Sequence, residues 1–113
     1  MHTLYGIKQC GTVKKAQVWL QDHQIAYQFH DVKVAGLTEA QLTVFAEALG
    51  WEALVNKRST TWRQLPDTRK QDLTQATALQ LLIDYPTLMK RPILAFEGGF
   101  LLGFNAEHYQ HTL

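Results

Sequence analysis

Cys10 is the side chain with the clearest chemical potential, and it is the only cysteine among the 113 residues. The apolar segment at residues 3–5 predicts a strand, and residues 13–20 predict a helix with Val13, Ala16 and Leu20 on one side. Cys10 therefore stands at a helix N-terminus, where unpaired N–H groups and the positive end of the helix dipole favour an anion. This position predicts a lowered thiol pKa and a raised fraction of reactive thiolate.

The opposite interpretation of Cys10 is structural, because a single cysteine is often a small buried hydrophobe. Its neighbours Lys8, Gln9, Gly11 and Thr12 are polar or small, which favours exposure instead. Lys8 either helps to hold the thiolate or simply faces solvent. Thr12 is expected to cap the helix, and its hydroxyl and N–H are also placed to face the sulfur.

The composition favours neither nucleic acid nor membranes as partners. Eleven Lys and Arg against ten Asp and Glu give a net charge of +1, and no apolar run approaches the roughly 20 residues of a membrane span. One cysteine cannot form an internal disulfide, and Met1 leads directly into the first strand without a signal peptide, so we expect a reducing, cytoplasmic setting. We expect no metal site, because His108 and His111 share a helical face without a third ligand. We also expect a monomer with no bound cofactor.

The first half of the chain supplies the elements that position Cys10. Residues 25–30 alternate and predict a second strand, with Ile25, Tyr27 and Phe29 on one face. A strand, a helix and a strand in this order normally form a parallel, right-handed crossover. Residues 32–36 are then predicted to be a loop.

A helical block and a hairpin complete the chain. Thr38 and Gln41 form a capping-box pattern for a helix that Gly50 ends. Short helical turns are expected at 51–54, 62–65 and 67–70, with a loop at 56–61 and a longer helix at 74–84 whose inward residues are Ala76, Leu79, Leu82 and Ile83. Residues 93–96 and 100–102 predict two strands joined by a turn at Gly98-Gly99, and Asn105 is expected to cap a last helix.

This order of elements predicts an α/β protein with the thioredoxin-like fold. We expect a mixed four-stranded sheet with helices on both faces, formed by a βαβ half and a ββα half. The 113 residues are expected to form one domain, with a helical insertion at about 37–90 between the two halves.

Three segments carry a resemblance to a known family: residues 4–16 around Cys10, the Lys90-Arg91-Pro92-Ile93-Leu94 segment, and residues 50–63 from Gly50 to Arg63. Over essentially its whole length the chain resembles the arsenate-reductase-like (ArsC) family, and residues 50–63 resemble the YffB branch in particular. It is also similar to the Spx transcription regulators, which share the fold. The resemblance implies that Cys10 is a nucleophilic thiolate and that the Arg91–Pro92 peptide bond is cis.

The resemblance also implies which residues bind the substrate. Arg91 matches one of three family arginines that hold an oxyanion, and either Arg58 or Asn56 takes the place of another. Gly11, Thr12, Lys8 and Pro92 are the further residues expected to contact substrate or glutathione. The third family arginine falls near Gly103 and a family histidine falls at Gly6, so both groups are absent.

These departures shape the functional hypothesis. The second cysteine of an Spx-type C-x-x-C switch falls at Val13, so an internal dithiol is excluded and an external thiol must complete any exchange. We therefore expect a glutathione-dependent thiol–disulfide oxidoreductase with glutathione as co-substrate and a small-molecule or protein disulfide as substrate. The alternatives are a non-catalytic, Spx-like regulator that binds RNA polymerase, and a genuine arsenate reductase.

Overall fold

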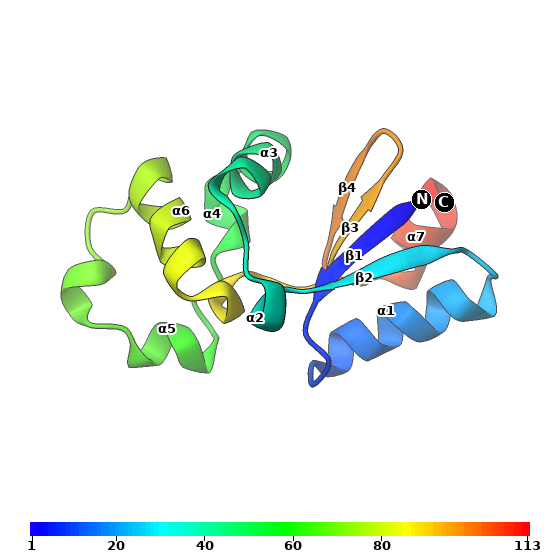
Figure 1. Cartoon of the computed structure of the whole chain (residues 1–113), viewed down its shortest axis with the longest axis horizontal. Coiled ribbons are helices and arrows are strands. Elements are labelled where there is room, and N and C mark those ends of the chain that lie inside the picture. Colours follow the sequence, from blue (N-terminus) through cyan, green and yellow to red (C-terminus); the bar gives the residue numbers. More distant parts are fainter. The chain divides into compact units, whose positions relative to one another are not determined.

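The computed structural model describes all residues from 1 to 113 and divides them into two compact units. The first unit comprises Met1–Ala35 and Arg91–Leu113, and it contains both termini (Figure 1). The second comprises Gly36–Lys90, so its bounds lie within one residue of the insertion predicted at about 37–90. No helix is long and apolar enough to cross a membrane.

The first unit is built on a four-stranded mixed sheet, as predicted. Its strands are β1 (His2–Gly6), β2 (Tyr27–Asp31), β3 (Ile93–Phe96) and β4 (Gly99–Leu102), in the order β2-β1-β3-β4. Strand β1 pairs parallel with β2 and antiparallel with β3, and β3 pairs antiparallel with β4. This arrangement confirms the thioredoxin-like fold class.

Two helices cover one face of this sheet: α1 (Gly11–Asp22) and α7 (Ala106–Thr112) (Figure 1). Leu4 and Leu94 are directly paired across β1 and β3 and are fully buried. They share one core cluster with Val13, Ala16, Leu20 and Tyr109 from the two helices. Because each fully buried leucine contributes roughly 1.5–3 kcal/mol, this cluster fixes α1, and with it Cys10, against the sheet.

The second unit is helical. It contains α3 (Glu39–Leu49), α4 (Trp51–Leu54), α5 (Thr60–Gln64), the 3₁₀ turn η1 (Asp67–Arg69), α6 (Gln75–Asp84) and the 3₁₀ turn η2 (Pro86–Leu88). The capping box of Thr38 and Gln41 is confirmed, and Thr74 with Thr77 forms a second one at α6. Each satisfies two backbone N–H groups that a helix start otherwise leaves unpaired. A short antiparallel bridge between Val55, which follows α4, and Met89 connects the middle of this unit to its C-terminal end.

Several local predictions were wrong. Residues 32–36 are not a loop, because Val32–Ala35 forms the short helix α2, whose Lys33 and Val34 N–H groups donate to Asp31 Oδ1. Strand β2 begins at Tyr27 rather than at residue 25. Helix α5 starts at Thr60, inside the predicted loop, because the Ser59 side chain caps it.

The hairpin and α6 also differ from expectation. Phe96 pairs with Gly99, so the two-residue turn is Glu97-Gly98 rather than Gly98-Gly99, and Gly98 adopts a φ of +109°. In α6 the buried side chains are Ala78, Leu79, Leu81 and Leu82, whereas Ala76 is exposed. Leu79 and Leu82 are thus buried as predicted, whereas Ala76 is exposed and Ile83 is only half-buried.

Candidate active site

The register of β1 and β3 brings the Arg91-Pro92 segment to the same end of the sheet as Cys10. Tyr5 pairs with Ile93, so Pro92, the preceding residue, lies beside the end of β1, and Cys10 follows that strand after a short loop. The Arg91–Pro92 bond is cis, which confirms the prediction. Gly103 joins this end of the sheet by donating its N–H to the Pro92 carbonyl at 2.8 Å.

Cys10 is half-buried and is the N-cap residue of α1. Burial raises the pKa of its thiol, but the N–H groups of Val13 and Thr12 and the side chain and charge of Arg91 oppose this, and the pKa ends below its usual value. The sulfur makes no regular cap hydrogen bond with the helix. The backbone N–H groups of Val13 and Thr12 nevertheless favour the thiolate over the thiol. A larger fraction of the thiolate, which is the nucleophilic form of cysteine, is the chemical consequence.

The residues flanking Cys10 differ in what they present. Thr12 is not the helix cap as predicted, because α1 begins at Gly11 and Cys10 itself is the N-cap residue. The Thr12 N–H nevertheless contributes to lowering the pKa of the thiol. Gly11, Thr12 and Lys8 are all exposed, and Pro92 is buried. Their predicted contacts with a bound substrate remain predictions.

Arg58 lies in the second unit, whereas Cys10 and Arg91 lie in the first. Its backbone is held locally, since its N–H donates to Asn56 Oδ1 at 3.0 Å and its carbonyl accepts from Arg63 Nη2 at 3.2 Å. The Asn56 side-chain oxygen is thus used within the loop, while no carboxylate lies within 4.0 Å of the Arg58 guanidinium. Arg58 and Asn56 were both considered for the place of a family arginine, and of the two only Arg58 carries a positive charge.

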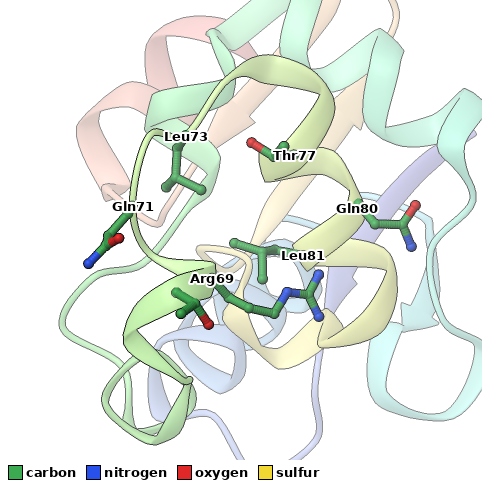
Figure 2. A pocket seen from close by; sticks show the side chains of 7 residues that line it. Arg69, Gln71, Leu73, Thr77, Gln80 and Leu81 are labelled. Carbon is green, nitrogen blue, oxygen red and sulfur yellow. The ribbon is translucent and has the colours of Figure 1, made fainter.

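A separate depression in the second unit is a poor candidate for anion chemistry. It has a volume of about 190 Å³ and is lined by Thr68, Arg69, Gln71, Leu73, Thr77, Gln80 and Leu81 (Figure 2). Its single charged group, Arg69, is already paired with Asp84 at 3.0 Å. The remaining polar groups are neutral amides and hydroxyls, which supply no nucleophile.

Comparison with known proteins agrees with this architecture. The model of the ArsC family matches residues 5–112. The chain belongs to the ArsC family. An uncharacterised protein of Haemophilus influenzae is 52% identical over 110 residues, covering 97% of this chain and 96% of that protein. The solved structure of a YffB protein superposes with a TM-score of 0.97 at 40% identity, covering 100% of this chain and 99% of the other.

Regulators named Spx are more distant relatives. The global transcriptional regulator Spx of Streptococcus agalactiae is 27% identical over 116 residues, covering 100% of this chain and 83% of that protein. The resemblance to the ArsC family, its YffB branch and the Spx proteins is therefore confirmed.

The structure bears on two positions, 6 and 103, at which the resemblance implied that groups of the family are absent. A Cβ atom on Gly6 would lie 2.7 Å from Cγ2 of Val13, so the larger side chain of a histidine does not fit there. Gly103 has a φ of +77°, which L side chains rarely adopt, so an arginine at that place would be strained. The blocking role of Val13 was missed because sequence spacing carries no information about volumes between elements.

Proposed function

We propose that this protein is a glutathione-dependent thiol–disulfide oxidoreductase that acts through Cys10 alone. The observation that carries the proposal is the position of Cys10 as the N-cap residue of α1, where the Val13 and Thr12 N–H groups and Arg91 lower the thiol pKa despite partial burial. A thiol that serves only as a small packing residue gains nothing from these donors. Membership of the ArsC family supports the same direction.

The reaction consists of two thiol–disulfide exchanges. The Cys10 thiolate attacks one sulfur of the substrate disulfide, which forms a mixed disulfide on Cys10 and releases the other half as a thiolate. The thiolate of reduced glutathione then attacks the mixed disulfide, which regenerates Cys10 and carries the substrate half away as its glutathione disulfide. No second cysteine competes for the first intermediate, because Val13 occupies the place of a resolving cysteine.

Glutathione suits this site because it carries both a thiol and two carboxylates. Arg91 already acts on the Cys10 sulfur through its side chain and charge, and its planar guanidinium can also bind a carboxylate with paired hydrogen bonds. No acidic side chain lies within 4.0 Å of Arg58, so its positive charge is available to a carboxylate. Small-molecule and protein disulfides are both substrates in this scheme.

Intact mass spectrometry tests the proposal. Incubation of the parent protein with oxidised glutathione is expected to add one glutathione, which reduced glutathione then removes. Cys10→Ser should give no adduct, and Arg91→Ala should form the adduct more slowly than the parent. Lys15→Ala is the control, because it removes one exposed positive charge from α1 and should leave the rate unchanged. If the parent protein forms no adduct under mildly oxidising conditions, the glutathione mechanism is wrong.

A second candidate function is that of a protein-binding regulator. It is favoured by the match to Spx proteins over the full length of this chain. A binding module has no need of a reactive thiol, so the two functions differ in the effect expected of Cys10→Ser. If the protein is an oxidoreductase, the variant loses the activity toward disulfides that the parent has. If the protein is only a binding module, the parent has no such activity and the variant still binds the partner.

A further inference from the structure

The second unit contains a basic depression that includes Arg58 but none of the residues that act on the Cys10 sulfur. It has a volume of about 550 Å³ and lies around helix α4, the loop before α5 and the last residue of the unit. Its lining residues are Glu52, Val55, Asn56, Lys57, Arg58 and Lys90. Three of these six side chains are positively charged and one is negatively charged.

A second depression of about 290 Å³ adjoins the first. The two share Glu52, Val55 and Lys57, and the second adds Trp51, Lys70 and Leu73. The joint surface, called the basic groove below, therefore carries four positive charges against the single carboxylate of Glu52. Trp51 and Leu73 add half-buried apolar walls, and Val55 adds a buried one.

Three of the four positive charges of the basic groove have no carboxylate partner. No carboxylate lies within 4.0 Å of Lys57, Arg58 or Lys90. Lys70 is 3.9 Å from the carboxylate of Asp67, a side chain that is 91% exposed, and such surface pairs contribute little. Like charges gathered without partners repel one another, so an incoming anion is stabilised there.

Two of the ammonium groups are also held in place. Lys57 Nζ lies 5.6 Å and Lys70 Nζ 5.5 Å from the ring centroid of the same indole, that of Trp62. The cation–π interaction orients the two side chains without neutralising them. Less side-chain entropy is then lost when an anion binds, which makes the groove a better anion site than freely moving lysines would be.

We propose that the basic groove binds an acidic peptide segment of a protein partner. A peptide that carries both carboxylates and aliphatic side chains matches a lining that combines several lysines with the apolar side chains of Trp51 and Leu73. A nucleic-acid backbone is a poorer match, because Glu52 lies within the groove and the chain carries a net charge of only +1. This binding goes beyond the proposed function, since it does not use Cys10.

Fluorescence anisotropy with short labelled probes tests the proposal. The first probe alternates glutamate with leucine, the second has glutamine in place of glutamate, and the third is an oligothymidine. The parent protein should bind the glutamate peptide more tightly than either other probe, and Cys10→Ser should bind it equally well. The Lys57→Gln/Lys90→Gln variant should weaken binding by about tenfold or more.

The control variant is Lys14→Gln/Lys15→Gln, which removes the same charge from exposed positions on α1. Its affinity for the glutamate peptide should lie within about twofold of that of the parent, because a change in net charge alone has only a small, salt-screened effect. Equal weakening in both double variants, no binding of the glutamate peptide, or tighter binding of the oligothymidine would each overturn the proposal. Cys10→Ser is expected to bind the glutamate peptide as well as the parent does. Failure of peptide binding is therefore distinguishable from failure of the exchange reaction.

Discussion

Gly6 and Val13 are in such close contact that a single methyl group on Gly6 would overlap the valine. An added Cβ would lie 2.7 Å from Cγ2 and 2.9 Å from Cγ1 of Val13. Val13 is fully buried in the core between α1 and the sheet, so it has little room to move. One residue of α1 therefore both occupies the place of a second cysteine and keeps position 6 free of a side chain.

Gly6→Ala should destabilise the protein by about 1–3 kcal/mol, since overpacking a filled core forces neighbours off their preferred rotamers. Gly11→Ala is the matched control, because its Cβ would meet no atom within 4 Å and the residue is exposed at the start of α1. That control should be neutral or stabilising by about 0.5–1 kcal/mol. Urea unfolding measures both, and equal effects of the two changes would show that the Val13 contact is unimportant.

The rate at which iodoacetamide alkylates Cys10 should rise with pH through an inflection below about 8.5, the pKa of a free cysteine thiol. Arg91→Ala should move the inflection upward, because the side chain and charge of Arg91 help to lower the pKa. Lys15→Ala removes an equal charge and should leave it unchanged. An inflection at the free-thiol value in the parent, or a thiol that does not react, would contradict the thiolate assignment.

The same lowered pKa predicts how stability changes with pH. Because the native thiol loses its proton at lower pH than the unfolded one, Cys10 contributes stability that is present above the unfolded pKa and is lost as pH falls through the folded pKa. The unfolding free energy of the parent relative to Cys10→Ser should therefore increase between neutral pH and about pH 8.5. A difference that decreases over this range would reverse the sign of the inferred shift.

Tyr109→Phe should stabilise the protein by about 1 kcal/mol, because the Tyr109 hydroxyl is fully buried without a hydrogen-bond partner from the protein. Burial raises the pKa of Tyr109 to about 12, so the unfolded chain releases this proton near pH 10 while the native state retains it. The parent should thus lose stability above about pH 10, and the variant should lose less.

Urea unfolding at neutral pH and at about pH 10.5 measures this difference. Tyr27→Phe is the control, because its half-buried hydroxyl accepts from Gln21 Nε2 at 3.5 Å. A Tyr109→Phe variant that is less stable than the parent at neutral pH would show that the hydroxyl has a favourable partner.

Arsenate reduction by the purified protein with glutathione and glutaredoxin should be weak or absent. Position 6 has no room for a side chain and position 103 has a backbone that disfavours one, and the resemblance implies that these positions lack two groups of the family's oxyanion site. Loss of one such donor commonly costs ~2.7–4 kcal/mol of transition-state stabilisation. Turnover equal to that of a family arsenate reductase assayed in parallel would show that other residues replace them.

Local patterns predicted the elements that local forces decide. The capping box of Thr38 and Gln41 and the cap at Asn105 were recognisable because side chain and backbone lie within three residues of each other. The buried face of α6 was predicted only in part, because Leu81 and Ile83 are both large and apolar and the sequence does not choose between them. Packing against the rest of the second unit selects Leu81 and leaves Ala76 exposed.

The candidate site also combines features set by neighbouring residues with features set by the fold. The position of Cys10 before a helix was predictable because strand, loop and helix are consecutive and the N–H groups that act on the sulfur come from the next residues. The approach of Arg91 to this sulfur depends on the fold, since the antiparallel pairing of Tyr5 with Ile93 brings together segments from opposite ends of the chain. The fold also decides that Gly6 must remain glycine, because that limit is set by the volume of Val13 across the interface between helix and sheet.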